Sequence, residues 1–179
     1  MVSEAGRCRG VASAGSDGTE VARATTEPAP VPAEGFIAKV IGISDGDTCD
    51  VLTADRKTIR LRWNAIDAPE TGQPFGNNAK QWVSDRIGGK MVRVVELDRD
   101  RYGRIVAEIY EADGTSVNVE LVRAGLAWHY RQYAPSRNGV AAAEKEARAN
   151  LRGLWAGSHQ VFPPWDWRRL SKLERDRFR

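Results

Sequence analysis

The segment RWNAIDAPE, residues 62–70, sets an arginine and two carboxylates along a strand that is otherwise apolar. Charged side chains beside an apolar core are costly unless they are paired or bind a metal ion. Strand alternation places Arg62 on the face opposite Trp63. A straight strand would carry Asp67 onto the apolar face, so we expect a bend there. After the bend, Asp67 and Glu70 face the same cleft as Arg62.

Two further charged clusters accompany this segment. The stretch SDGDT, residues 44–48, places Asp45 and Asp47 around a glycine at a strand end, and DRYGR, residues 100–104, ends in Arg104. Each cluster alone is also typical of a charged turn, because Asp and Gly favour turns. In the same way, the arginine of the first segment alone is also typical of a surface ion pair.

Taken together, the three clusters hold the side chains that phosphodiester hydrolysis requires. The carboxylates are Asp47, Asp67 and Glu70, and the arginines are Arg62 and Arg104. Carboxylate oxygens suit Ca²⁺ or Mg²⁺ and not zinc. A guanidinium binds two phosphate oxygens at once and stabilises charge that develops in the transition state. A carboxylate can position or deprotonate the attacking water. The combination therefore predicts a metal-assisted phosphodiesterase.

The elements that must position these residues follow from the apolar pattern. Short apolar runs predict five strands, at residues 36–44, 48–53, 58–66, 91–97 and 104–111. Helical spacing with glycine stops predicts three helices, at residues 76–90, 116–125 and 138–153. Three strands, a helix, two strands and then helices fit a small closed barrel better than a parallel sheet. We expect an α+β protein, an OB-fold five-stranded barrel with about three helices.

The 179 residues suffice for one domain, which we place at residues 35–157. Residues 1–34 contain no Leu, Ile, Phe, Tyr or Trp, so we expect a disordered leader. The leader also lacks the apolar stretch of a signal peptide. The compartment stays open, because either the protein is cytoplasmic or its true start differs. No apolar run approaches the length of a membrane span.

We interpret the remaining residues, 158–179, as an anchor followed by a basic tail. Residues 168–179 carry six Lys/Arg and two Asp/Glu, a charge of +4, whereas the whole chain carries +3. The two prolines of FPPWDW argue against regular structure, and we expect Trp165 or Trp167 to be buried. Beyond this anchor we expect a tail that is helical at best and mobile. It should add salt-dependent affinity for polyanions and nothing to the chemistry. A role in solubility is an equal alternative.

The motifs also occur in a recognisable order. They are DGDT at 45–48, RLRWNAIDAPE at 60–70, YGR at 102–104, VELVRAGLAW at 119–128 and RGLW at 152–155. In order and spacing they resemble the staphylococcal nuclease (thermonuclease) family, over about two thirds of the chain. The resemblance implies a monomeric OB-fold enzyme that needs Ca²⁺ and does not bind membranes. It implies cleavage of DNA and RNA, single strands preferred, with little sequence preference, leaving 3′-phosphate and 5′-hydroxyl ends.

The resemblance also implies a set of metal-binding residues. By position, Asp47 and Asp67 would bind Ca²⁺ directly through their carboxylates. Ala68 would bind it through its backbone carbonyl, which tolerates any side chain at that position. Asp45 would support the metal site without binding the ion directly.

Further residues are implied for catalysis and substrate binding. By position, Glu70 would act as the general base or orient the attacking water, and Arg62 and Arg104 would bind the scissile phosphate. Tyr102 and Tyr133 would contact the nucleotide, where a base can stack on a tyrosine ring. In the stretch HYRQY, residues 129–133, Tyr130 could make this nucleotide contact in place of Tyr133. Each of the three tyrosines could instead pack in the core.

Two other functions remain as alternatives. Barrels of this family also occur as binding modules for nucleic acid or peptides, and those usually lack the arginines or the acids that this chain retains. A Ca²⁺-binding structural protein would bind the metal without turnover, but it leaves the two arginines without a purpose.

Overall fold

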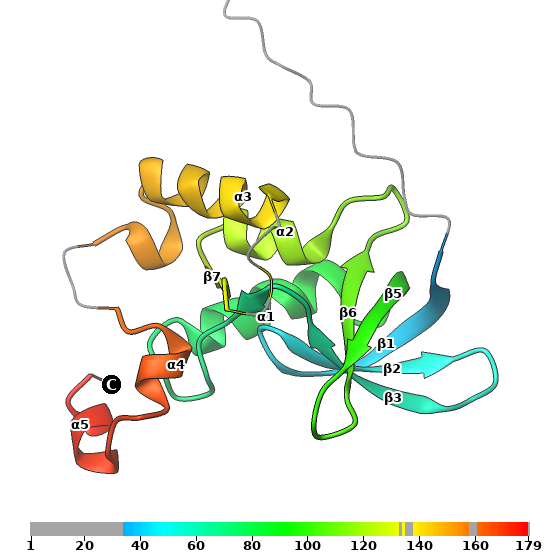
Figure 1. The fold of residues 1–179 in the computed structure, drawn as a ribbon, viewed down its shortest axis with the longest axis horizontal. Helices are drawn as coiled ribbons and strands as arrows, with labels where there is room; N and C mark the ends of the chain where they lie inside the picture. Colours follow the sequence, from blue (N-terminus) through cyan, green and yellow to red (C-terminus); the bar gives the residue numbers. More distant parts are fainter. Residues whose placement is uncertain (1–33, 133, 135–137, 158–160, 179) are drawn as a thin grey trace, which may run out of the picture.

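The computed structural model describes residues 34–132, 134, 138–157 and 161–178. Within them, five strands close a mixed barrel in the order β1-β2-β3-β6-β5 (Figure 1). These strands are β1 Phe36–Asp45, β2 Thr48–Thr53, β3 Thr58–Trp63, β5 Met91–Arg99 and β6 Ile105–Tyr110. The expected five-stranded OB-type barrel is confirmed. The predicted leader lies outside the described residues apart from Glu34.

Antiparallel neighbours and one parallel pair close the barrel. β1 pairs with β2 and β5, β2 with β3, and β5 with β6, all antiparallel. β3 and β6 run parallel, with Leu61 opposite Ile105. Because side chains alternate along each strand, every strand sends apolar residues inward. The core includes the fully buried side chains of Val40, Val51, Leu61, Trp63, Val94 and Ile109.

The third strand ends earlier than the sequence predicts. β3 stops at Trp63, and Ala65 then adopts a left-handed backbone conformation with φ 64°. The chain continues as a separate short strand, β4 Ile66–Asp67, which pairs with β7 Trp128–His129. The strand predicted over 58–66 is therefore two strands. The expected bend is real, and Ala65 is where the chain turns.

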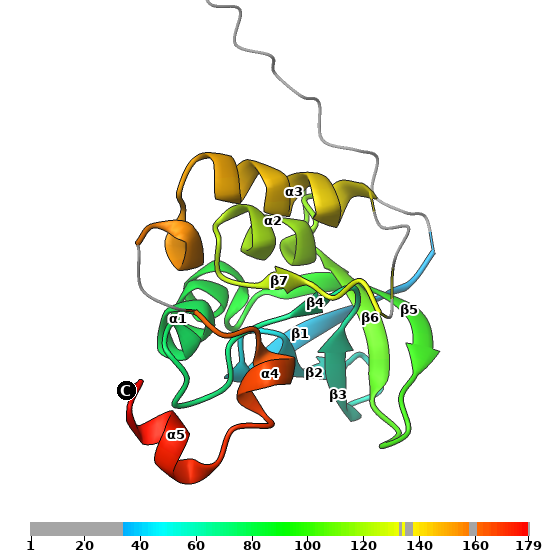
Figure 2. The same cartoon turned by 60° about the vertical axis from the view of Figure 1, so that its left-hand side comes forward.

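Three helices cover the barrel where they were predicted. α1 Gly76–Ile87 buries Ala79, Val83 and Ile87. α2 Val117–Arg123 begins at Ser116, whose side chain caps the helix, and packs against α3 Asn138–Ala149 (Figure 2). A short 3₁₀ helix, η1 Gly153–Trp155, follows α3.

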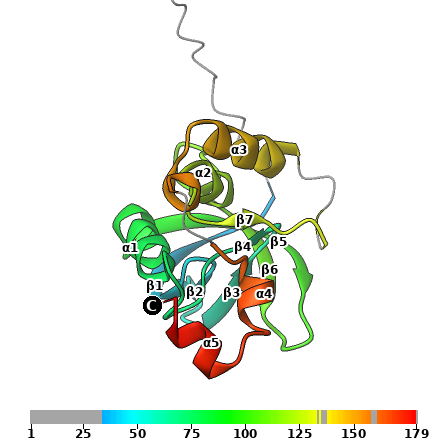
Figure 3. The same ribbon diagram turned by 90° about the vertical axis from the view of Figure 1, so that its left-hand side faces the viewer.

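The C-terminal segment forms two short helices, α4 Pro164–Trp167 and α5 Lys172–Asp176. The expectation of irregular structure in FPPWDW is wrong because Pro164 is the first helical residue, where a missing N–H is tolerated. Trp167 is buried, which confirms the anchor. α4 and α5 lie on the side of the molecule away from α2 and α3 (Figure 3). No helix in the described ranges is long and apolar enough to cross a membrane.

Candidate active site

Arg62 lies between the two buried aspartates. Its Nη1 is 2.8 Å from Asp47 Oδ2 and its Nη2 is 2.9 Å from Asp67 Oδ1. The side chains of Arg62, Asp47 and Asp67 are 15%, 7% and 0% exposed. The turn at Ala65 brings Asp67 round to the face of Arg62, as the charge pattern predicts. These three residues therefore form a buried charged cluster at one end of the barrel.

The turn between β1 and β2 holds Asp47 in this cluster. Asp45 Oδ1 accepts a hydrogen bond from the backbone N–H of Asp47 at 3.1 Å, and Ala68 N donates to Asp47 Oδ2 at 2.6 Å. Gly46 is required between the two acids by close packing. A Cβ at Gly46 would lie 2.7 Å from Cβ of Ala68 and 2.8 Å from Cβ of Ala79. The turn thus packs directly against α1 and the segment after β4.

Burial dominates the electrostatics of the two aspartates. Desolvation raises the pKa of Asp47 to about 8, against the opposing effect of the Arg62 charge. Desolvation likewise raises the pKa of Asp67 above its usual range, although Arg62 and Arg168 favour the charged form. Asp67 Oδ2 is buried without a hydrogen-bond partner. One oxygen of the cluster therefore lacks the hydrogen bond that a buried carboxylate oxygen needs.

The donor set fits a hard divalent cation. Two buried carboxylates offer oxygen ligands, and the unpaired Oδ2 of Asp67 is an acceptor that a cation would satisfy. In this conformation, no group of three or more His, Cys, Asp or Glu in the described part of the chain is arranged to hold a metal ion. The remaining ligands would therefore be backbone carbonyl, water or substrate oxygens.

Glu70 lies beside Asp67 on the segment that follows β4. Its backbone N–H donates to Gln73 Oε1 at 3.0 Å, and Gln73 Nε2 donates to the carbonyl of Phe162 at 2.6 Å. Its carboxylate Oε1 is 2.7 Å from Nε of Arg168, whose Nη2 is 2.7 Å from Asp67 Oδ1. The side chain of Glu70 is 38% exposed, so solvent reaches its carboxylate.

Arg168 is the residue that the sequence analysis missed. We expected residues beyond 167 to contribute nothing to the chemistry, since none was expected to reach the metal site. The structure corrects that premise, because Arg168 forms ion pairs with both Asp67 and Glu70. A signal was present in the sequence: the residue directly after a buried tryptophan anchor must itself lie close to the folded domain.

Arg104 and Tyr102 lie at a neighbouring groove, apart from the acidic cluster. Arg104 Nε pairs with Asp100 Oδ2 at 2.7 Å, and its guanidinium lies 5.6 Å from the ring centre of Tyr102. This open groove has a volume of about 580 Å³ and also includes Arg60 and Arg99. Tyr102 is 69% exposed. In the described structure Arg104 therefore pairs within its own turn and forms no ion pair with Asp47, Asp67 or Glu70.

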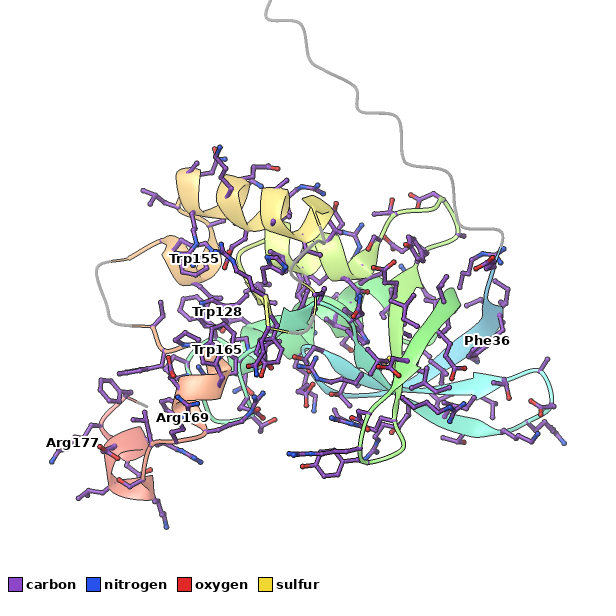
Figure 4. The ribbon with its side chains drawn as sticks, viewed as in Figure 1. Phe36, Trp128, Trp155, Trp165, Arg169 and Arg177 are labelled. Carbon is purple, nitrogen blue, oxygen red and sulfur yellow. The ribbon has the colours of Figure 1, made fainter. Side chains whose placement is uncertain are left out.

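Of the two tyrosines in the stretch 129–133, the structure describes only Tyr130. Tyr133 lies outside the described residues. Tyr130, the alternative in the same stretch, stacks on Trp165 with ring centres 5.2 Å apart and planes at 7°. Trp165 in turn contacts Trp128 edge to face, and Trp128 contacts Trp155 (Figure 4). Tyr130 therefore packs within an aromatic cluster that holds α4 in place.

The fold and this cluster define the class of the protein: an OB-type barrel with buried acids and an arginine between them at one end. Comparison with known proteins gives the family. The model of the family described as staphylococcal nuclease homologue matches residues 59–157. The chain belongs to the staphylococcal nuclease family and is a nuclease.

Three relatives show how far the similarity extends. A protein named "uncharacterized endonuclease" from Escherichia coli is 41% identical over 139 residues, which cover 78% of this chain and 89% of the relative. A protein named "micrococcal nuclease" from Shigella flexneri is 42% identical over 146 residues, covering 76% and 83%. A third, an "uncharacterized endonuclease" from Haemophilus influenzae, is 40% identical over 135 residues, covering 75% and 74%.

Proposed function

We propose that this nuclease is Ca²⁺-dependent and hydrolyses both DNA and RNA with little sequence preference, leaving 3′-phosphate ends. The observation that carries the proposal is the buried cluster of Arg62, Asp47 and Asp67, in which Asp67 Oδ2 has no partner and Glu70 lies alongside. Acids alone would suit a metal-storage site. A guanidinium fixed among them suits a phosphate ester.

Asp47 and Asp67 would hold the cation through their carboxylates, and Ala68 through its backbone carbonyl. When bound, a divalent cation polarises a phosphoryl oxygen and stabilises the charge that develops on it. Asp45 keeps the turn of Asp47 in place through its hydrogen bond to the Asp47 N–H. We favour Ca²⁺ over Mg²⁺ because a site at strand ends does not enforce the octahedral shell that Mg²⁺ prefers.

Glu70 would act on the attacking water, either by accepting its proton or by orienting it. Its partly exposed carboxylate is open to solvent, unlike the buried aspartates. Arg62 would bind the scissile phosphate, since its guanidinium is already fixed by two carboxylates before substrate arrives. We propose that Arg104 binds the same phosphate after its partly exposed side chain rotates away from Asp100.

The groove beside Arg104 would carry the nucleotide chain. Tyr102 is exposed there among arginines, so a base can stack on its ring while the guanidinium groups neutralise the backbone. Tyr133 is proposed as a second nucleotide contact. Stacking of this kind requires unpaired bases, so we propose a preference for single strands. The enzyme is proposed to act as a monomer.

The test is cleavage of single-stranded DNA and of RNA in Ca²⁺, in Mg²⁺ and in EDTA, with the product ends identified. We expect both polymers to be cut in Ca²⁺ only, with 3′-phosphate ends. The Asp67→Asn variant is the matched control, because it removes a charge from the proposed metal site and keeps the size of the side chain. Tight binding of nucleic acid without cleavage in any metal would show a binding module instead.

A further inference from the structure

The C-terminal segment places a second arginine, Arg168, beside Arg62 in the acidic cluster. Arg168 follows α4 directly, about one hundred residues along the chain from the acids that it contacts. Its Nε lies 2.7 Å from Glu70 Oε1 and its Nη2 lies 2.7 Å from Asp67 Oδ1. The guanidinium therefore bridges a carboxylate proposed to bind metal and the carboxylate proposed to act on water.

Arg168 is held at this position by its own segment. Trp167, its neighbour, is buried, and Arg175 from α5 donates to two backbone carbonyls at this point. Arg175 Nε lies 3.1 Å from the carbonyl of Trp167, and Arg175 Nη2 lies 2.9 Å from that of Arg168. α5 thus caps the C-terminal end of α4 and fixes the backbone from which the Arg168 side chain extends.

The segment of Glu70 is tied to the same part of the chain by a second contact. Gln73 is buried, and it links the backbone N–H of Glu70 to the carbonyl of Phe162 through its side-chain amide. The backbone of Glu70 and its carboxylate are therefore both connected to residues 162–168. The Gln73 bridge and the Arg168 ion pair are independent contacts to Glu70, and together they favour a positioning role over a chance ion pair at the surface.

Arg168 engages only one oxygen of each carboxylate. It takes Oδ1 of Asp67, which Arg62 also contacts, and leaves the buried Oδ2 without a partner. On Glu70 it takes Oε1, and Oε2 has no hydrogen bond in the described structure. An arginine that blocked the site would engage these second oxygens. Arg168 instead orients each carboxylate through one oxygen.

The charges around the cleft point the same way. Four carboxylates surround it, those of Asp45, Asp47, Asp67 and Glu70, and Arg62 offsets one of them. A phosphodiester is an anion, so this excess of negative charge repels it. A second guanidinium inside the cleft reduces the repulsion where the scissile phosphate must lie.

We propose that Arg168 is a positioning residue of the active site, which holds the Glu70 carboxylate in its working orientation and makes the C-terminal segment part of the catalytic apparatus. The proposal rests on the proposed function, because it assigns Arg168 to the same reaction. It acts through Glu70, so its effect is on the rate of the chemical step more than on substrate binding.

Three full-length variants test the proposal. Arg168→Ala removes the guanidinium, and Arg168→Lys keeps the charge but bridges the two carboxylates poorly. Arg169→Ala is the matched control, since Arg169 is the adjacent arginine, its side chain is 81% exposed, and it pairs with Asp166 at 3.6 Å instead of with the acidic cluster. Each is assayed in Ca²⁺ on a nitrophenyl ester of a single nucleotide, which is too short to contact charges outside the cleft.

We expect Arg168→Ala to lower kcat about 10- to 100-fold with a smaller change in KM, in line with the loss of groups that orient active-site residues. Arg168→Lys should lie between the Ala variant and wild type, and Arg169→Ala should stay within about twofold, as a surface residue away from the site does. Added guanidinium ion should restore part of the activity of Arg168→Ala. A merely structural contact would not respond to that ion.

A second measurement does not depend on turnover. Crystal structures of wild type and Arg168→Ala should show the Glu70 carboxylate displaced in the variant, with Arg62, Asp47 and Asp67 unmoved. Should Arg168→Ala fail to fold, Arg168→Gln, which keeps most of the side-chain length, replaces it in both measurements. If wild type cleaves nothing, the proposed function fails, and the position of Glu70 in the variant still decides whether Arg168 orients it.

Three results would overturn the proposal. A kcat for Arg168→Ala equal to that of wild type would make the contact an ordinary ion pair. A kcat above that of wild type would show that Arg168 restrains the enzyme instead of assisting it. An unmoved Glu70 carboxylate in the variant structure would equally refute a positioning role.

Discussion

Replacing each of the two sequence-predicted arginines by lysine should separate their roles. Arg62 bonds two buried carboxylates through different nitrogens, at 2.8 and 2.9 Å. A lysine has one nitrogen, so Arg62→Lys keeps one contact and leaves the other carboxylate short of a charged hydrogen bond. Such a bond is worth about 1.5–3 kcal/mol. Arg104→Lys keeps its pairing with Asp100 at the surface and should cost less than about 0.5 kcal/mol.

The assay compares urea unfolding with initial rates. Unfolding is measured in EDTA, because a bound cation would compensate for the lost contact. Arg62→Lys should unfold with a free energy lower by about 2 kcal/mol, which corresponds to a melting temperature lower by about 4–8 °C for a chain of this size. Arg104→Lys should unfold like wild type. Both should lower kcat by about a hundredfold, because each loses its paired donors to the phosphate.

Either half of this prediction can fail separately. If Arg62→Lys is as stable as wild type without metal, Arg62 does not hold both aspartates in solution. If folded Arg104→Lys cleaves at the wild-type rate, Arg104 belongs to its turn with Asp100 and never reaches the substrate. A loss of stability in Arg104→Lys would mean that its surface pairing matters more than its exposure indicates.

Three other changes have defined outcomes. Gly46→Ala should lower the free energy of unfolding by about 1–3 kcal/mol, because its methyl carbon would lie 2.7 Å from the buried Cβ of Ala68. Gly139→Ala should not lower it, because its methyl carbon would lie 3.8 Å from the nearest atom. Urea unfolding of the two variants tests the difference. Burial raises the pKa of the Cys49 thiol to about 12, so the neutral thiol stabilises the fold fully below about pH 9 and this contribution is lost toward about pH 12. In a Cys8→Ser background, labelling of Cys49 at pH 8 should occur only through unfolding, and labelling faster than unfolding would contradict this. A chain that ends at Leu170 should show a higher KM for long DNA at low salt, with the difference shrinking at high salt; an unchanged KM would leave the tail to solubility.

The barrel was predictable because its signals are local. Alternating apolar residues mark each strand, and the glycines after Ile87 and Ala124 end two of the helices where the sequence predicts. The early end of β3 was not predictable, since the left-handed position of the turn is taken by Ala65 and not by its neighbour Asn64, the residue type that favours this conformation. Tertiary pairing of β4 with β7 determines that turn.

The acidic cluster was predictable for the same reason, whereas the places of Arg168 and Arg104 relative to it were not. Asp47, Asp67 and Arg62 lie on neighbouring strand ends, so strand alternation and one bend suffice to bring them together. The contact of Arg168 with Glu70 depends on how a tryptophan-rich segment packs against the barrel. The tryptophan anchor indicates that Arg168 lies close to the folded domain, but spacing along the chain does not say which residues it contacts. Whether Arg104 approaches the phosphate likewise depends on a side-chain rotation that the sequence does not encode.

The pairing of β4 with β7 has a consequence for the order of events during synthesis. Asp67 lies opposite Trp128 in this two-stranded sheet, and β3 closes the barrel against β6, which begins only at Ile105. Both pairings join residues that are far apart in sequence. Each must therefore close a long loop, and the chain entropy is lost before the stabilising contacts form. The acidic residues emerge from the ribosome early, but they cannot reach their final geometry until residue 128 has followed. A ribosome-bound chain shorter than this should therefore lack the assembled site.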